Sequence, residues 1–216
     1  PVMDIDWDIT PESIHNKLPQ AHESSPDEEY LSAFLSDAPK PAAVLVPLLK
    51  TPIEPGGKSI WHLLLTRRSD RLTEHRGQVA FPGGRSDPGD PTPEATALRE
   101  AYEEIGLFPD LVQILGRLPN LWTITNYCVT PVVSMIPWPF SVRLATNEVS
   151  RIFIIPLYWL ADPAHHEVHQ REIPSSYSVQ FKSERYPIIY YHSYDGEVLW
   201  GVSAEITHNL IRSLLK

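Results

Sequence analysis

Three glutamates, Glu100, Glu103 and Glu104, stand together in the segment that reads REAYEEIGL from Arg99 to Leu107. If this segment is a helix, residues three and four positions apart share a face, so the carboxylates converge within one turn. Their mutual repulsion at neutral pH is unfavourable unless a cation lies among them. Oxygen ligands favour hard divalent ions, which complete their shells with water and substrate phosphates. The spacing therefore predicts Glu100, Glu103 and Glu104 as ligands of Mg2+ or Mn2+.

The flanking residues favour a helix with defined ends. Thr92 suits an N-cap, Pro93 suits the first helical position, and Gly106 can adopt the left-handed conformation that follows a last turn. Apolar residues recur at helical spacing and predict a buried stripe that leaves the glutamates on another face. The stripe consists of Leu98, Ala101, Tyr102 and Ile105.

A solvated acidic helix is the simpler alternative for an isolated E-x-x-E-E pattern. Further features favour a site. Arg99 precedes the glutamates, and a double glycine, Gly83 and Gly84, lies upstream. A loop rich in proline and glycine, which carries Asp87 and Asp90, must turn back over the start of the helix.

The run from Gly84 to Leu107 resembles the signature of the Nudix hydrolases, in which a glycine is followed at a distance by R-E-apolar-x-E-E-x-G-apolar. The resemblance implies an α/β/α sandwich with a mixed sheet and hydrolysis of a nucleoside diphosphate linked to another moiety. Two departures are present. The spacing from Gly84 to Arg99 is one residue longer than usual, and Asp90 stands where a loop glutamate is expected.

The segment LLLTRRSDRLTEHRGQVAFPGG, from Leu63 to Gly84, resembles an additional motif of the coenzyme A diphosphatase branch of that family. This branch also has the longer glycine-to-arginine spacing with aspartates in the loop. Residues 199–204 resemble its closing W-G-x-T-A, with Ser203 in place of the threonine. The resemblance implies coenzyme A or a derivative as substrate, and 4′-phosphopantetheine and adenosine 3′,5′-bisphosphate as products.

A local basic cluster precedes the double glycine, in a chain whose formal net charge is −9. Such an acidic chain is not expected to bind nucleic acid through its overall field, so the cluster is predicted to bind substrate phosphates. Alternatively, at least two of its arginines pair with the acidic loop at Asp87 and Asp90. The expected substrate-binding residues are Arg67, Arg68, Arg71, Arg76, Gly83 and Gly84.

Each candidate residue is given a role in metal-assisted hydrolysis. Glu100 and Glu104 are expected to hold the ion with help from Glu103, and Arg99 to orient the glutamates by charge-assisted hydrogen bonds. A nearby carboxylate takes the proton of the attacking water, and the candidates are Glu103 and Glu148. The resemblance implies an acidic residue at position 148; an exposed glutamate at the start of a strand is the simpler alternative.

Two other functions stay open on the sequence. One is a Nudix hydrolase of another substrate, such as NADH, ADP-ribose or a nucleotide sugar. The other is a Nudix-fold binding module without turnover, whose expected sign is the loss of a helix glutamate; all three are present.

Composition is ordinary for a globular protein, with 42% hydrophobic and 21% charged residues among 216. No apolar stretch is long enough to cross a bilayer, and no leader is evident. The single cysteine, Cys128, is expected to fill space in a buried strand, and a single cysteine fits a reducing cytoplasm. A small molecule is therefore the expected partner, with neither nucleic acid nor membrane, and a homodimer is left open.

The element pattern predicts a helical preface over residues 1–40, with a capping box at 25–28, and one Nudix domain over 41–216. A polar loop, 161–171, carries His165, His166 and His169, a weak candidate for a softer metal. Trp122, Trp138, Trp159 and Trp200 are expected mostly in the core. Strands are predicted at 42–49, 61–65, 114–118, 127–136 and 151–157, a second hairpin at 186–192 and 198–200 with its turn at Asp195 and Gly196, and a final helix at 204–215.

Overall fold

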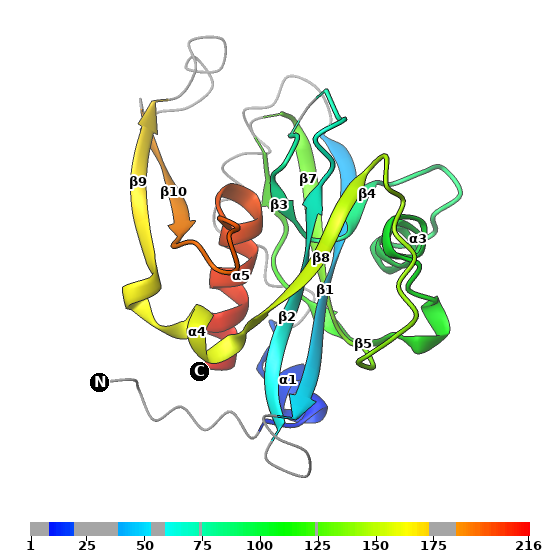
Figure 1. The fold of residues 1–216 in the computed structure, drawn as a ribbon, viewed down its shortest axis with the longest axis horizontal. Coiled ribbons are helices and arrows are strands. Elements are labelled where there is room, and N and C mark those ends of the chain that lie inside the picture. The colour runs from blue at the N-terminus through cyan, green and yellow to red at the C-terminus, as the bar shows by residue number, and fades with distance from the viewer. Residues whose placement is uncertain (1–8, 20–38, 53–58, 74, 124, 173–184) are drawn as a thin grey trace.

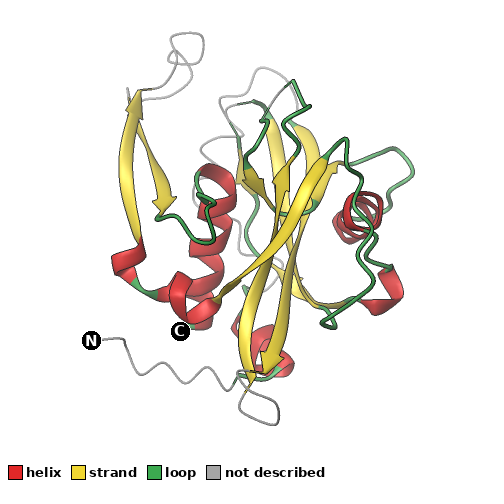
Figure 2. Cartoon of the chain, in the orientation of Figure 1, coloured by secondary structure: helices red, strands yellow, loops and turns green. Residues whose placement is uncertain are grey.

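The computed structural model describes residues 9–19, 39–52, 59–73, 75–123, 125–172 and 185–216. In these parts of the chain an eight-stranded mixed sheet lies between helices (Figures 1 and 2). The predicted fold class, an α/β sandwich with a mixed sheet, is confirmed. The strands of this sheet are β1 (Lys40–Pro52), β2 (Ser59–Arg68), β3 (Val79–Ala80), β4 (Gly83–Arg85), β5 (Gln113–Arg117), β6 (Leu121–Trp122), β7 (Tyr127–Met135) and β8 (Val149–Pro156).

The helices form two layers on opposite faces of the sheet. Helix α3 (Pro93–Ile105) packs on one face, while α5 (Gly201–Leu214), with α1 (Pro11–Lys17) and α4 (Leu157–Ala161), covers the other (Figure 1). Short 3-10 helices follow α3 and α4, at Pro109–Leu111 and Pro163–His165. Within the described residues no helix is both long and apolar enough to cross a membrane.

The central strand β1 alternates its side chains between the two layers. Ala43, Leu45 and Leu49 pack with α3, while Val46 and Leu48 pack on the α5 side. Because successive residues of a strand point to opposite faces, a strand that is covered on both faces reads as an unbroken apolar run. Burial of β1 on both faces therefore explains the unbroken apolar run of residues 42–49.

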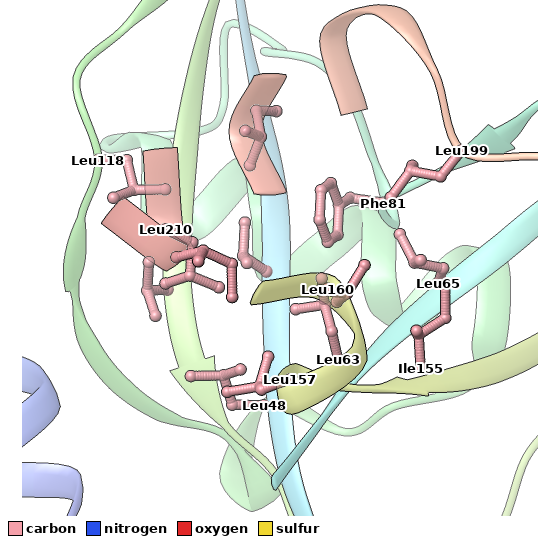
Figure 3. Close-up of a cluster of buried hydrophobic side chains, with 14 of the residues drawn as sticks. Leu48, Leu63, Leu65, Phe81, Leu118, Ile155, Leu157, Leu160, Leu199 and Leu210 are labelled. Atoms are coloured by element: carbon pink, nitrogen blue, oxygen red, sulfur yellow. The ribbon is translucent and has the colours of Figure 1, made fainter. Parts of the chain in front are cut away.

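The larger core cluster lies between the sheet and α5. Figure 3 shows Leu48, Leu63 and Leu65 of the sheet converging with Leu160 of α4 and Leu210 of α5. This packing fixes the sheet against α5 and leaves the opposite face for the helix that carries the glutamates.

Strand pairing brings distant segments to one end of the sheet. Strand β1 runs antiparallel to β2 and parallel to β7, and β4 pairs with the start of β1. Strand β8 adds to β2, so Arg68 at the end of β2 lies opposite Val149 at the start of β8. The end of β2, the start of β8 and the double glycine of β4 therefore lie near one another.

The region from 157 to 200 differs from the sequence prediction. Where a polar loop was expected, α4 and a 3-10 turn are followed by strand β9 (His166–Glu172), which pairs with β10 (Arg185–Tyr191) in a separate two-stranded sheet. The predicted partner segment 198–200 makes only an isolated bridge to β10. The prediction failed because β9 is polar and exposed and so shows no apolar alternation. The turn at Asp195 and Gly196 is confirmed, with both residues at positive φ.

The other differences concern termini and tryptophans. Helix α1 lies within the predicted helical preface, but the helix expected after Ser25 lies outside the described residues, so the division at residue 40 stays a prediction. Cys128 lies in β7, as expected, but is only half-buried. The tryptophans expected mostly in the core are all partly exposed, namely Trp122, Trp138, Trp159 and Trp200, whereas Trp61 of β2 is 1% exposed.

The α5 layer can be tested with Leu210→Ala. Leu210 is 0% exposed, so truncation should leave a cavity and lower the free energy of unfolding by about 2–5 kcal/mol. Leu215→Ala, at a position 41% exposed, is the matched control and should change it by about 0.5 kcal/mol or less. Urea denaturation with an unchanged m-value measures both. Equal effects of the two substitutions would contradict the packing of α5 on the sheet.

Candidate active site

Helix α3 has the ends that the sequence predicts. The Oγ1 of Thr92 accepts a hydrogen bond from the backbone N–H of Ala95 at 3.2 Å, and Pro93 begins the helix. Gly106 ends it with φ of 72°, where a Cβ would also approach that of Arg143 to 2.9 Å. Of the predicted apolar stripe, Ala101 and Ile105 are buried, while Leu98 and Tyr102 are half-buried.

Arg99 connects the acidic loop with the glutamates. Its guanidinium donates to both carboxylate oxygens of Asp90, at 3.2 and 2.9 Å, and to the backbone carbonyl of Arg85 at 3.1 Å. It also donates to Glu100 at 2.9 Å and to Glu103 at 3.2 Å. One arginine thus fixes the loop carboxylate and two helix carboxylates relative to one another. These are the contacts expected of an orienting residue, and that role stays a prediction.

The acidic loop is built around Asp90. Its carboxylate also accepts hydrogen bonds from the backbone N–H of Asp87 at 2.9 Å and from the hydroxyl of Thr96 at 3.0 Å. The hydrogen bonds from Arg99 and Asp87 hold the pKa of Asp90 well below its usual range, so it stays ionised. The supporting role of Thr96 was not predicted. Its signal in the sequence is weak: one polar residue in the first helical turn.

The double glycine is required by close packing on both sides. A Cβ on Gly83 would lie 2.5 Å from the backbone carbonyl oxygen of Ala43 in β1, and a Cβ on Gly84 would lie 2.5 Å from Oε1 of Glu100. Real Cβ contacts of this length do not occur. At Gly83 the neighbour is backbone, so only glycine fits against β1, whereas a Cβ at Gly84 would have to displace the end of the Glu100 side chain. Substrate contact by these glycines stays a prediction.

Glu104 is a buried carboxylate whose negative charge is only partly offset by its surroundings. It is 4% exposed, and its Oε2 has no hydrogen-bond partner among the described residues. Burial raises the pKa of Glu104 to about 8, repulsion from Glu100 and Glu148 adds to this, and the positive charge of Arg68 opposes it. A cation next to this carboxylate would remove both the burial cost and the repulsion.

Glu148 lies close to the α3 carboxylates although it is far from them in sequence. The backbone N–H of Ala145 donates to the carbonyl of Glu104 at 2.9 Å, and the N–H of Glu148 donates to the carbonyl of Ala145 at 2.8 Å. The carbonyl of Glu148 accepts from the N–H of Ser69, just beyond β2, at 2.8 Å. The segment before β8 is therefore tied both to the end of α3 and to the base of the arginine-rich loop.

Glu100 shares this environment. Burial is the main cause that raises the pKa of Glu100, the charges of Glu103 and Glu148 add to it, and the Arg99 guanidinium opposes it. Glu103 is exposed at the rim. The structure thus brings together Glu100, Glu104 and Glu148, with Glu103 at the edge, as the sequence analysis anticipated for a site.

The donor set fits Mg2+ or Mn2+. All the donors are carboxylate oxygens, one of them is buried without a partner, and the pKa values of Glu100 and Glu104 are raised by burial and by neighbouring carboxylates. As placed, no three His, Cys, Asp or Glu side chains of the described residues form a group that could hold an ion. Binding would therefore need small side-chain movements together with water or substrate phosphates, which such ions usually retain.

The four predicted arginines lie in different surroundings. Arg68 is half-buried, with an unpartnered Nε, and its charge acts on Glu104. Arg71 and Arg76 are exposed in the loop after β2. The alternative that this cluster pairs with Asp87 and Asp90 is wrong, because their carboxylates pair with Arg99.

Arg67 is placed differently from the expectation. Its guanidinium donates to both oxygens of Asp70, at 3.0 and 2.9 Å, and to Ser150 at 3.1 Å, and it lies 3.6 Å from Glu197. These partners occupy the groups that a phosphate would need. Glu197 is a residue that the sequence analysis missed; it also lies 3.6 Å from Arg151 and was hidden beside the predicted turn.

The histidines do not form a metal site among the described residues. His165 stacks on Trp159 and its Nδ1 lies 2.9 Å from the Trp159 carbonyl oxygen. His169 pairs with Glu167 at 2.8 Å on β9. His165 and His169 therefore have partners within the protein, and metal binding here, which the sequence already made the weaker alternative, is not supported by the described residues.

Comparison with known proteins defines the class of protein. The NUDIX domain model matches residues 39–175, more than half of the chain. Proteins described as "Uncharacterized Nudix hydrolase NudL" are 38% identical in Photorhabdus laumondii, over 83% of this chain and 88% of that protein, and 36% identical in Yersinia pestis, over 85% and 84%. The chain therefore belongs to the Nudix hydrolases, enzymes that act on nucleoside diphosphate derivatives and generally use divalent metal ions.

Solved structures give a looser likeness. An Ap4A hydrolase from C. elegans is 24% identical, with a TM-score of 0.43, over 54% of this chain and 80% of that one. A MutT/nudix family protein from Enterococcus faecalis is 14% identical, with a TM-score of 0.45, over 88% and 73%. At such scores these likenesses carry no information about the substrate.

The burial of Glu104 makes a signed prediction for stability against pH. Because its folded pKa of about 8 lies above its ordinary value of 4.5, the folded state holds the proton more tightly. The stability that this proton confers is present below about pH 4.5 and is lost as the pH rises to about 8. Without metal, Glu104→Gln should therefore unfold at a higher temperature than wild type at pH 8.5, and the difference should shrink towards pH 5.

Thermal unfolding in chelator measures this difference, with Glu103→Gln, at an exposed position of the same helix, as the control. Mg2+ or Mn2+ should raise the midpoint of wild type more than that of Glu104→Gln, since a ligand of the native state stabilises it by mass action. Parallel midpoints of wild type and Glu104→Gln across the pH range would show that this carboxylate does not carry a burial cost.

The packing of Gly84 on Glu100 gives a second prediction. In Gly84→Ala the new Cβ must displace the Glu100 carboxylate, so Mn2+ affinity and kcat/KM should each fall about tenfold or more. Gly89→Ala is the matched control, because a Cβ there meets nothing within 4 Å. Calorimetric Mn2+ titration and turnover measure the effect, with circular dichroism to verify folding. If both alanine variants bind Mn2+ like wild type, Glu100 is not a ligand.

Proposed function

We propose that this chain hydrolyses the diphosphate bond of coenzyme A or one of its derivatives, giving 4′-phosphopantetheine and adenosine 3′,5′-bisphosphate. The observation that carries the proposal is the contact between two segments. The arginine-rich loop starts at Ser69, whose N–H donates a hydrogen bond to the backbone carbonyl of Glu148, beside the α3 carboxylates. A ligand with a diphosphate and a separate phosphate could use both the carboxylate site and the arginines.

In this proposal the carboxylates bind the cation. Glu100 and Glu104 hold Mg2+ or Mn2+ and Glu103 assists. When bound, the ion supplies positive charge that offsets the charge of the diphosphate oxygens in the transition state. Arg99 keeps Glu100 and Glu103 oriented towards the site through its bonds to Asp90 and to both glutamates.

The remaining residues handle the proton and the substrate. Glu148 is the first candidate to accept the proton of the attacking water, because its backbone is fixed on two sides and its charge acts on both Glu100 and Glu104; Glu103 is the second. Arg68, beside Glu104, would contact the diphosphate, and Arg71 and Arg76 would reach the 3′-phosphate. Gly83 and Gly84 let the substrate approach the backbone. A reducing, cytoplasmic setting is part of the proposal, because the sequence has one cysteine.

The 3′-phosphate provides the sharpest test. Dephospho-coenzyme A lacks only this group, so an arginine that reads it loses a charge-assisted bond of roughly 1.5–3 kcal/mol, or about one to two decades in kcat/KM. Arg71→Ala or Arg76→Ala should lower turnover of coenzyme A towards the dephospho level and leave dephospho-coenzyme A nearly unchanged. Arg212→Ala, an exposed arginine on α5, is the matched control and should leave both substrates unaffected.

The same assay includes NADH, ADP-ribose and a nucleotide sugar, each with Mg2+ and with Mn2+. Faster turnover of any of these than of coenzyme A would overturn the substrate assignment while leaving the hydrolase class intact. Equal turnover of coenzyme A and dephospho-coenzyme A would show that the arginines do not bind the 3′-phosphate. Binding of these compounds without turnover of any would favour a binding module.

A further inference from the structure

Strand β9 is the open edge of a ribbon that stands apart from the main sheet. It pairs with β10 alone, and the two strands lie beyond α5, away from α3 (Figure 1). No described residue outside this pair makes a backbone hydrogen bond to residues 166–172. An edge of this kind presents unpaired backbone donors and acceptors, and a two-stranded ribbon is by itself only marginally stable.

The two strands of the ribbon differ in burial. Strand β10 packs against the body of the protein through Ile188 and Tyr191, which are buried. Six of the seven residues of β9 are exposed and the seventh is half-buried; Val168 is 56% exposed. The ribbon is thus anchored through β10, and the outer edge of β9 is accessible to a further strand.

The sequence of β9, HEVHQRE, is complementary to itself. In an antiparallel pair of two copies about a two-fold axis perpendicular to the sheet, side chains stay on their own faces, so one residue must lie opposite the same residue of the second copy, with the axis midway between them. With the axis at His169, Glu167 lies opposite Arg171 of the second copy, and His166 lies opposite Glu172. All seven residues of β9 are then paired.

Neighbouring registers are poorer. An axis at Val168 pairs only five residues of β9 and leaves Arg171 without an opposite residue. An axis at Gln170 also pairs five and sets His169 against Arg171, which lacks any charge attraction. Opposite charges across strands stabilise a sheet and like charges destabilise it, so the charge pattern selects the register centred on His169.

We propose that two copies of this chain form a dimer by antiparallel pairing of their β9 strands, centred on His169. Within one copy Arg171 lies over the rings of Tyr190 and Trp200 and donates to the Tyr190 hydroxyl, and in the dimer it exchanges part of these contacts for Glu167 of the second copy. Glu167, which contacts His169 at 2.8 Å within one copy, exchanges this partner for Arg171 of the other. A strand of seven residues is only about 23 Å long. The interface is therefore small, and the dimer is expected to be weak, with a Kd on the order of micromolar or above.

Charge reversal at β9 tests the pairing. Glu167→Arg and Arg171→Glu each set like charges opposite one another twice per dimer, so each should raise the Kd about tenfold or more. The combined variant Glu167→Arg, Arg171→Glu restores opposite charges and should dimerise like wild type. An equimolar mixture of the two single variants should form a heterodimer, because each complements the other. Asp110→Arg, at an exposed position next to α3, is the control and should dimerise normally.

Sedimentation equilibrium of the full chain, from micromolar to millimolar concentration, measures every variant. Wild type that stays monomeric over this range overturns the proposal. A dimer that both single reversals leave unchanged also overturns it, since the interface then lies elsewhere. If the single variants lose the dimer and neither the combined variant nor the mixture regains it, charge pairing in this register is wrong. Turnover is read in parallel and should not change, because β9 is remote from α3.

Discussion

Electrostatic repulsion among carboxylates constrains the structure of the region around Glu100, Glu104 and Glu148. Glu104 is buried, Glu100 is half-buried, and the charge of Glu148 acts on both. Within the described residues, Arg68 and a backbone hydrogen bond from Gly83 offset the charge of Glu104, and Arg99 offsets that of Glu100, while Oε2 of Glu104 has no hydrogen-bond partner. An arrangement of this kind costs stability in the absence of a cation. A bound cation would offset this charge, as proposed for these carboxylates, and without one the raised pKa of Glu104 favours a proton in its place.

The fold sustains this cost by fixing the carboxylates from several directions. Helix α3 is packed on the sheet through Ala101 and Ile105, Gly84 of β4 lies directly against the Glu100 carboxylate, and Arg99 is held by Asp90. The segment before β8 closes the remaining side through hydrogen bonds to α3 and to Ser69. Since each support comes from a different element, no local stretch of sequence could form the site alone.

The sequence was most informative where local rules decide the structure. The caps of α3 at Thr92 and Gly106 and the strand at residues 42–49 follow from residue types and periodicity, and they were predicted correctly. Strand β9 was missed because an exposed polar strand carries no apolar pattern. Helix α1 lies in the predicted helical preface but was not delimited, although Thr10 caps it and Pro11 begins it as Thr92 and Pro93 do for α3.

The arginines show where sequence reasoning about a site must stop. Arg67 and Arg68 are adjacent and chemically identical, yet successive residues of a strand point to opposite faces. Arg68 consequently acts on Glu104 on the α3 side, whereas Arg67 is held by Asp70 and Glu197. The sequence shows how many charged residues a cluster contains. Only the strand pairing, with its irregularity between these two residues, assigns each charge to a face. In the proposed function, phosphate binding is therefore assigned to Arg68, Arg71 and Arg76, because the guanidinium of Arg67 is already engaged by Asp70 and Glu197.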